Sequence, residues 1–303
     1  MKHRTAILAL IAAGSLWGLT VALSKLSMRW LDPSWLTASR FLIAAPVLAV
    51  IGRRGFRQAL TPRIFLSGSI GYGAVMLLQN AGIDRTSVSH GAIIVGALPV
   101  VVALVTMALG NGSAGGAAWV GYGLALLGVV LVAGGGGGGA TASGDMLVFA
   151  SVVLSGVFIA VQPSALEGRD AAAVTAVQFL SAAVLALPFA LASGLPHVRP
   201  APALVVAFVA LALIGTILPF WLFAYGQGRV APELAGAFVN LEPLVGAVVG
   251  WVAFADPVGP WQVAGALAVV AGILISLLAQ DVRAWLPRAQ RLVDSALLGI
   301  RRP

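Results

Sequence analysis

Ten apolar stretches, each about as long as a helix that crosses a lipid bilayer, fill most of this 303-residue chain. Residues 41–51 and 204–218 are apolar around the whole helix, so they face lipid or other helices rather than water. Only 9% of the residues are charged, against roughly a quarter in a soluble domain. The sequence therefore predicts an all-α integral membrane protein with ten transmembrane helices. The stretches lie near residues 5–24, 34–51, 64–83, 86–109, 117–134, 145–163, 171–193, 202–225, 231–254 and 260–280.

Positive charges gather in the connections that would share one side of the membrane with the N-terminus. These connections contain Lys2, Arg4, Arg53, Arg54, Arg57, Arg63, Arg169, Arg229, Arg283, Arg288, Arg291, Arg301 and Arg302, whereas the others hold Lys25, Arg29, Arg85 and Arg199. Because cytoplasmic loops carry the excess of Lys and Arg, we expect a multi-pass protein of the cell (inner) membrane with both termini in the cytoplasm. The net charge of +8 follows mostly from this topology and needs no nucleic-acid partner.

The chain also repeats itself at an offset of 144 residues. Matches at this offset include Gly71 with Gly215, Leu78 with Leu222, Gly82 with Gly226, Arg85 with Arg229, Pro99 with Pro243 and Gly121 with Gly265. Five spans per copy is an odd number, so the second copy enters the membrane from the opposite side. We therefore expect two inverted five-helix repeats, residues 1–133 and 144–280. A Gly-rich connector at 134–143 would join them, and residues 281–303 would form an amphipathic or disordered cytoplasmic tail.

Inverted repeats are typical of secondary transporters, which place a substrate site near the bilayer midplane and expose it to each side in turn. A membrane channel and a non-transporting membrane scaffold are the alternatives. An intramembrane enzyme is the least favoured class, because only one acidic residue lies firmly at membrane depth. The chain has no cysteine, no P-loop and too few clustered ligands for a metal site, so no cofactor and no metal are expected.

Glu242 lies near the middle of the ninth stretch. A charged carboxylate that faces lipid costs about 2.5–3.5 kcal/mol on insertion scales, so Glu242 is expected to face the protein interior. There Glu242, with Asn240, either contacts substrate or exchanges a proton, or it forms a structural pair with a cation. Pro243 and its repeat equivalent Pro99 are expected to break their helices, because proline removes one helical hydrogen bond.

Three other side chains are candidates for substrate binding. Arg40 lies about two turns into the second stretch, where it either snorkels to the outer interface or lines a cavity. In a cavity its guanidinium would hold a substrate carboxylate or phosphate, or neutralise Glu242. Trp17 and Gln178 are far enough from the ends of their stretches to reach the same cavity.

A second set of polar residues lies toward the predicted outer face. Gln79, Asn80 and His90 cluster near the outer ends of the third and fourth stretches, and Lys25 lies at the outer end of the first. They are candidates for a gate or vestibule, because amides and imidazole can exchange hydrogen bonds between two conformations. Static interhelical hydrogen bonds, and an interface anchor in the case of Lys25, are the alternative interpretations.

Two small-residue spacings, Gly14-x-x-x-Gly18 and Gly246-x-x-x-Gly250, predict close helix packing within the chain. A homodimer face is the second interpretation of the same spacings. The other expected partners are a small-molecule substrate and the lipid bilayer, and either a proton or a counter-substrate would couple transport.

Several motifs in this order resemble the ten-helix EamA branch of the drug/metabolite transporter (DMT) superfamily. They are Leu16-Trp17-Gly18 with Lys25, Arg40-Phe41, Leu78-Gln79-Asn80-Ala81-Gly82 followed by Thr86-Ser87 and Pro99, and Asn240-Leu241-Glu242-Pro243-Leu244 followed by Asp256 and Gly265. The resemblance covers essentially all of residues 5–280. It implies export or exchange of small polar or amphipathic metabolites, such as amino acids, across the inner membrane. His90 and Asp256 depart from the family pattern, and this leaves the substrate open.

Overall fold

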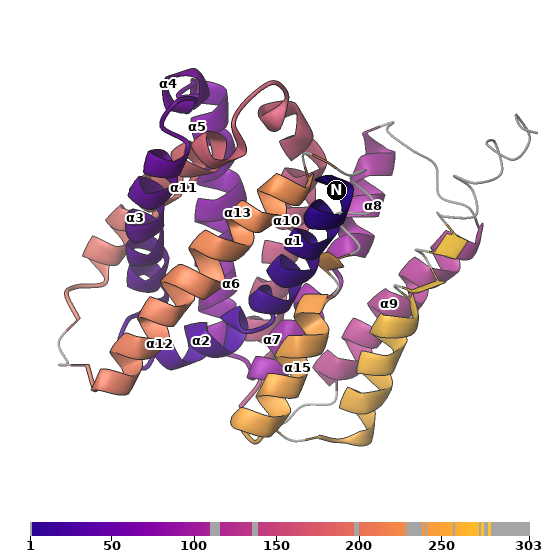
Figure 1. Cartoon of the computed structure of the whole chain (residues 1–303). Coiled ribbons are helices and arrows are strands. Elements are labelled where there is room, and N and C mark those ends of the chain that lie inside the picture. The colour runs from indigo at the N-terminus through magenta and orange to yellow at the C-terminus, as the bar shows by residue number, and fades with distance from the viewer. Residues whose placement is uncertain are drawn as a thin grey trace, which may run out of the picture.

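The computed structural model describes residues 2–109, 116–134, 139–196, 200–227, 229, 238–239, 241–256, 258–272, 274–275 and 278–279. Figure 1 shows these residues as a bundle of helices joined by short turns. Asn240, residues 135–138 of the Gly-rich connector and the predicted tail at 281–303 lie outside the described residues.

The helices follow the order of the apolar stretches. They are α1 (Lys2–Trp17), α2 (Thr20–Ser27), α3 (Pro33–Ile51), α4 (Phe56–Ala59), α5 (Pro62–Gly68), η1 (Ser69–Ala74), α6 (Val75–Asp84), α7 (Val88–Val95), α8 (Leu98–Ala108), α9 (Gly116–Gly134), α10 (Ala142–Leu166), α11 (Ala171–Ala192), α12 (Pro202–Ala212), η2 (Leu213–Ile217), α13 (Leu218–Gln227) and α15 (Leu241–Ala253). A further apolar helix spans Pro260–Gly272.

Seven described segments are long and apolar enough to cross a membrane. They are Arg4–Ser27, Pro33–Ile51, Pro62–Asp84, Val88–Ala108, Ala142–Leu166, Ala171–Ala192 and Pro202–Gln227. Shorter apolar helices, Gly116–Gly128, α15 and Pro260–Gly272, occupy the predicted fifth, ninth and tenth positions. The predicted all-α membrane fold is confirmed, and the boundaries of the seven long segments differ from the prediction by a few residues. In the predicted ninth stretch (231–254), α15 begins only at Leu241, and residues 231–237 and 240 lie outside the described ones.

The helices begin where the sequence provides capping groups. The Asp32 carboxylate accepts hydrogen bonds from the Ser34 and Trp35 amides at 2.8 and 3.2 Å at the start of α3. The Asp170 carboxylate accepts one from the Ala173 amide at 2.8 Å at the start of α11. These caps satisfy backbone N–H groups that a helix in lipid cannot leave without a partner.

The two caps also reveal a second repeat offset. Asp32 and Asp170 are 138 residues apart, and the same offset relates Thr37 to Thr175 in the α3–α11 pair. From the third span of each repeat onward the offset is 144. The π-helical segments η1 and η2 show this, since they begin at Ser69 and Leu213, which are 144 residues apart. The second repeat therefore carries six more residues (144 against 138) between its second and third spans.

Close helix contacts obey both offsets. Gly18, in the turn after α1, packs against Val245 of α15, and Gly156 of α10 packs against Val101 of α8. An offset of 138 relates the two glycines and an offset of 144 relates the two valines. The two contacts are therefore repeat-equivalent. In one of them a glycine of the first repeat packs on a valine of the second, and in the other the two repeats exchange these roles. A pseudo-two-fold axis relates the two halves of the bundle.

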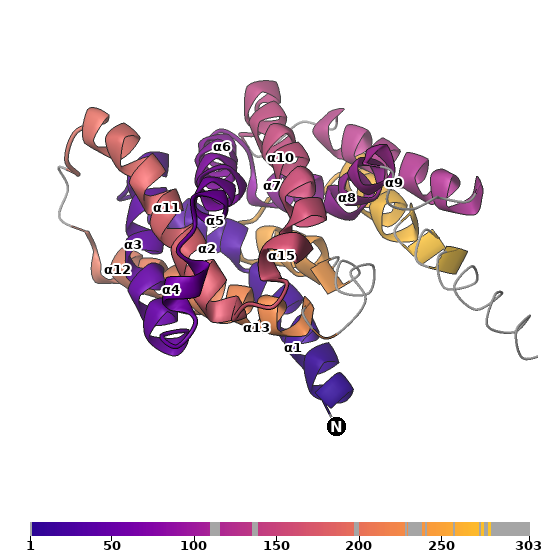
Figure 2. The same cartoon turned by 90° about the horizontal axis from the view of Figure 1, so that it is seen from above.

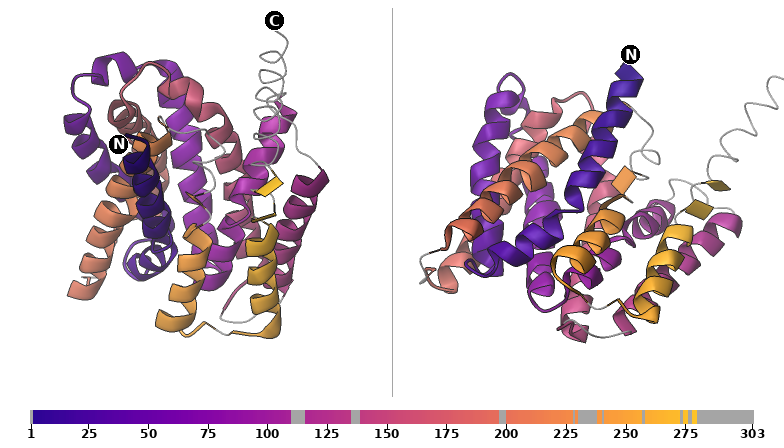
Figure 3. Two further views of the ribbon diagram at one scale, coloured as in Figure 1. Left: turned by 45° about the vertical axis from the view of Figure 1, so that its right-hand side comes forward. Right: turned by 60° about the horizontal axis from the view of Figure 1, so that its bottom comes forward.

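The fifth helices of the two repeats pack on each other in the same reciprocal way. Gly128 of α9 lies against the backbone of Gly265, and Gly272 lies against the backbone of Gly121 of α9. A side chain at either glycine would meet main-chain atoms of the opposite helix, so only glycine permits this approach. Figures 2 and 3 show α9 and the Pro260–Gly272 helix side by side at one edge of the bundle.

The two small-residue stripes, Gly14-x-x-x-Gly18 and Gly246-x-x-x-Gly250, both pack against other helices of this chain. Gly14 and Gly18 lie against Phe238 and α15, whereas Gly246 and Gly250 lie against α7. Close intramolecular packing therefore accounts for both spacings. The interpretation of these stripes as a homodimer face is wrong, because helices of the same chain already cover them.

Candidate functional site

A cavity of about 1020 Å³, counting the space open to solvent, lies between the two repeats. Its lining comes from α1, α2, α3, η1, α6, α7, α8, α10, α13 and α15. Many lining positions are related by the repeat offsets, as Val95 and Val239, Met76 and Phe220, Gln79 and Phe223, and Ser24 and Gln162 illustrate. The cavity therefore surrounds the pseudo-two-fold axis, which is where an inverted-repeat carrier places its substrate.

Arg40 is buried in this cavity with 2% of its surface exposed. Its Nε donates a hydrogen bond to Thr216 Oγ1 at 3.0 Å, and its Nη1 lies 3.7 Å from the Met76 sulfur. Thr216 belongs to the π-helical turn η2 and donates in turn to the Leu211 carbonyl at 2.8 Å. Single π-helical turns are frequent at functional sites. Arg40 thus lines the cavity rather than snorkelling to the interface.

Glu242 also lines the cavity, in the first turn of α15, and is 7% exposed. A helix N-terminus favours a carboxylate because unpaired amide groups lie there. Arg40 is near enough for a Coulombic interaction with Glu242, but no ion pair within 4 Å joins them among the described residues. Glu242 therefore presents its carboxyl group to the cavity from the start of α15.

Aromatic rings form much of the cavity wall. Trp17 packs against Phe220 and Phe223 with ring centroids 5.0 and 4.9 Å apart. Tyr72 packs against Phe158 and Phe220 at 4.8 and 5.1 Å. Such rings give apolar contact area at a small cost in side-chain entropy. The cavity therefore offers a large apolar wall together with one cation and one carboxyl group.

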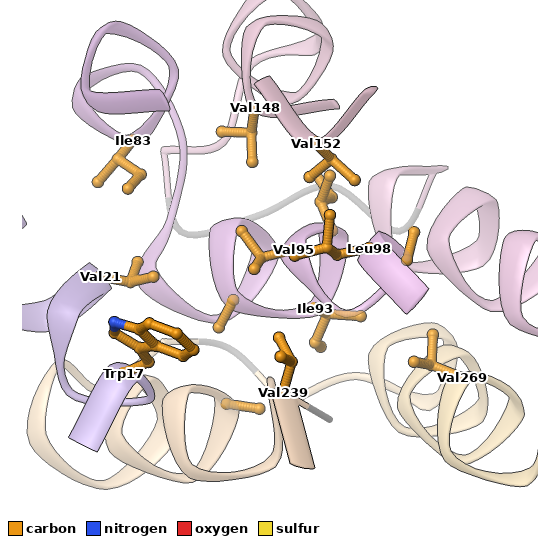
Figure 4. Close-up of a cluster of buried hydrophobic side chains, with 14 of the residues drawn as sticks. Trp17, Val21, Ile83, Ile93, Val95, Leu98, Val148, Val152, Val239 and Val269 are labelled. Atoms are coloured by element: carbon orange, nitrogen blue, oxygen red, sulfur yellow. The ribbon is translucent and has the colours of Figure 1, made fainter. Parts of the chain in front are cut away.

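Trp17 also contributes a polar group. Its Nε1 is buried and has no hydrogen-bond partner among the residues that the structure describes. Buried indole N–H groups usually have a partner, so this donor is available to a ligand. Figure 4 shows Trp17 at the edge of the apolar cluster that contains Val21 and Val239.

The other sequence candidates fall into two places. Gln79 and Asn80 line the same cavity rather than a separate vestibule, and Asn80 Nδ2 donates to Thr37 Oγ1 at 2.9 Å. Gln178 does not line it. Its amide exchanges two hydrogen bonds with Gln162, at 3.0 and 2.8 Å, and so supports a lining residue from behind.

Lys25 and His90 lie together at the end of the bundle where α6 meets α7, which we call the α6–α7 end. Lys25 Nζ donates to the carbonyls of Ile83, Asp84 and Thr86 at 2.7, 2.9 and 2.7 Å. His90 is buried beside Asp145, outside the cavity lining. The amine of Lys25 thus ties α2 to the turn between α6 and α7.

Pro99 and Pro243, the two predicted helix breakers, occupy repeat-equivalent positions. A turn at Gly96 and Ala97 separates α7 from α8, and Pro99 lies in the first turn of α8. Pro243 lies in the first turn of α15. Proline costs little in a first helical turn, because the amide there has no partner within the helix.

Sequence reasoning missed several residues of the site. Tyr72, Thr216 and Gln162 carry no motif, but an alignment at both repeat offsets would have placed Gln162 opposite the cavity residue Ser24. Asp145 was not a candidate, because it is the first residue of the predicted sixth stretch (145–163) and a carboxylate at the end of a span is not unusual. No group of three or more His, Asp or Glu side chains that could hold a metal occurs among the described residues.

Two five-helix repeats around one shared cavity are the architecture of a multi-pass membrane transporter. The model of the EamA-like transporter family matches residues 4–134 and 142–278. The chain therefore belongs to the EamA-like transporter family, within the DMT superfamily, and it is a transporter rather than an enzyme.

Individual relatives agree with this assignment. An uncharacterized transporter of Archaeoglobus fulgidus is 25% identical over 271 residues, which cover 86% of this chain and 93% of the relative. The uncharacterized transporter YyaM of Bacillus subtilis is 24% identical over 287 residues, with 90% and 94% coverage. One solved crystal structure shares the fold with a TM-score of 0.72 at 21% identity, and the match covers 92% of this chain and 99% of that one.

Proposed function

We propose that this transporter exports small amphipathic metabolites, namely amino acids and related compounds, by alternating access across the inner membrane. The observation that carries the proposal is that Arg40 and Glu242 both line one cavity whose wall is largely aromatic. A zwitterion with an apolar side chain would place its carboxylate on Arg40, its ammonium on Glu242 and its side chain on the rings. The unpartnered Nε1 of Trp17 adds a donor for a substrate oxygen.

The proposal assigns the remaining topology as follows. The repeats run over residues 1–133 and 144–280, joined by the connector at 134–143, with both termini in the cytoplasm. The α6–α7 end then faces outward, so Lys25 and His90 belong to the outer gate. Gln79 and Asn80 line the path between that gate and the central site. A proton or a counter-substrate provides the driving force.

Counterflow in proteoliposomes tests the proposal. Vesicles loaded with unlabelled phenylalanine or leucine should accumulate the labelled amino acid transiently, with a rate that saturates. Glu242→Gln should lower this rate, whereas Glu167→Gln, the same change at an exposed position, should leave it unchanged. Flux that never saturates, or that carries current without exchange, would identify a channel. Wild-type counterflow in an intact Glu242→Gln protein would remove this carboxyl from the substrate site.

A further inference from the structure

His90 and Asp145 form a buried pair at the α6–α7 end, and neither lines the central cavity. His90 Nδ1 lies 3.2 Å from Asp145 Oδ2, and the two side chains are 2% and 9% exposed. Thr86 Oγ1 donates a hydrogen bond to the other carboxylate oxygen of Asp145 at 2.5 Å. This is the only ion pair within 4 Å that the described residues contain. Both oxygens of a buried carboxylate are thus engaged, one of them by a group that can titrate.

The second ring nitrogen of His90 is a free acceptor. With Nδ1 facing a carboxylate, the neutral ring carries its proton on Nδ1 and leaves a lone pair on Nε2. Nε2 is buried, and no described residue offers it a hydrogen-bond partner. A proton taken up at Nε2 places a cation beside Asp145, which is favourable, but it creates an N–H donor without an acceptor, which is costly. In an opened arrangement water reaches Nε2 and accepts from this N–H group, so protonation favours opening of this end of the bundle.

Two other charged side chains also bind the segment that leads to His90, residues 83–89 at the α6–α7 end. Lys25 of α2 binds three carbonyls of residues 83–86, and Asp256, which follows α15, accepts a hydrogen bond from the Ser89 amide at 2.7 Å. The other titratable or charged groups on the elements packed against α7 are Asp84 and Arg85 at the end of α6, Tyr122 on α9 and Glu242 on α15. Glu242 faces the cavity, and Asp84 and Arg85 are exposed.

The pair breaks the symmetry of the repeats. His90 comes from the first repeat and Asp145 from the second, so the pair joins the two halves at one end of the bundle only. At the repeat offsets, Leu234 is the equivalent of His90 and Ile7 is the equivalent of Asp145. The sequence thus has apolar residues at both positions, so the His90–Asp145 pair has no titratable counterpart at the repeat-equivalent positions.

From this geometry we propose that His90 and Asp145 form a proton-binding site that controls the opening of the α6–α7 end. This proposal rests on the proposed transport function, and the ligand of the site is a proton from the outer solution. A proton from the outer solution forms an N–H bond at Nε2, and Asp145 balances the charge. The contact between the repeats then loosens, and the cavity becomes accessible from outside. Loss of the proton restores the closed contact.

The chain contains no cysteine, so a single introduced thiol can report on this opening. Ser151 lines the cavity on α10 and is 1% exposed. In vesicles, Ser151→Cys should react with a membrane-impermeant maleimide added outside only when the outer end opens. Between pH 7.5 and 5.5 its labelling should rise roughly tenfold relative to the same reporter in a His90→Gln background. Normalising to this background removes the pH dependence of the thiol itself. His3→Gln, the same change far from the site, should behave as His90 does.

A titration independent of the His90 variant provides the second measurement. With His3 and His197 both replaced by glutamine, His90 is the only histidine, and its ring signals can be followed by NMR. These signals should change over the same pH interval in which the labelling of Ser151→Cys rises. Equal pH profiles of labelling with and without His90, or no titration of the ring in this range, would overturn the proposal. If the proton-site proposal fails in one of these ways while the wild-type protein still shows counterflow, the proposed transport function is unaffected. The failure of the proton site and the failure of the transport function can therefore be distinguished.

Discussion

Arg40 and Glu242 offer opposite charges to one cavity, so their roles can be separated by substrate analogues that lack one charge each. A hydrogen bond to a charged group contributes about 1.5–3 kcal/mol, which corresponds to roughly 10- to 160-fold in affinity. Arg40→Gln should therefore weaken the binding of phenylalanine by a factor in this range. Glutamine is a natural replacement, because Gln178 occupies the repeat-equivalent position.

The analogues make this prediction specific. Arg40→Gln should weaken the binding of 3-phenylpropionate, which keeps the carboxylate, and leave phenethylamine nearly unaffected. Glu242→Gln should show the reverse pattern. Isothermal titration calorimetry on purified protein measures both, with Arg57→Gln and Glu167→Gln as exposed controls. If each cavity variant weakens all three ligands equally, the two charges stabilise the fold rather than recognise the ends of a zwitterion, and the reasoning is refuted.

Three further changes test other parts of the structure. Lys25→Gln removes three hydrogen bonds to backbone carbonyls and should lower thermal stability in detergent by about 1–3 kcal/mol, whereas exposed Arg29→Gln should not; an unchanged melting temperature would show that the Lys25 contacts contribute nothing. Gly128→Val and Gly272→Val should each destabilise the protein by at least about 1–3 kcal/mol and by similar amounts, because the repeat axis relates their contacts; a large difference in urea or thermal unfolding would argue against that axis. Trp17→Phe keeps the ring contacts but loses the indole donor, so phenylalanine should bind about 2- to 10-fold more weakly, and unchanged affinity would exclude the donor from the site.

The membrane fold could be predicted from the sequence because hydropathy and span length are local properties. The stretch predicted at 145–163 appears as α10 (Ala142–Leu166), and that at 171–193 as α11 (Ala171–Ala192). The ungapped offset of 144 found the repeat in its later helices only. The α3–α11 pair stayed hidden because the six extra residues shift its offset to 138.

Residues of the candidate site could be predicted where a charge exposed to lipid would cost so much free energy that the side chain must face the protein interior. Arg40 and Glu242 are charges at membrane depth, and both line the cavity. Gln178 has no such constraint, and it lies behind the lining, where its amide exchanges hydrogen bonds with the lining residue Gln162. The partnership of His90 with Asp145 joins residues 55 positions apart in the chain. No spacing rule connects such residues, so only the packing of α7 on α10 reveals the pair.

The symmetric backbone and the asymmetric chemistry have different consequences for transport. Equivalent helix contacts, such as Gly18 on Val245 and Gly156 on Val101, give the two ends of the bundle similar ways to close. Glu242 and His90 do not follow this symmetry, since Glu242 corresponds to Leu98 and His90 corresponds to Leu234. A carrier whose two closed states differed in packing alone would respond equally to conditions on both sides. Because the titratable contact lies at one end, pH on that side alone should shift the balance between the two states.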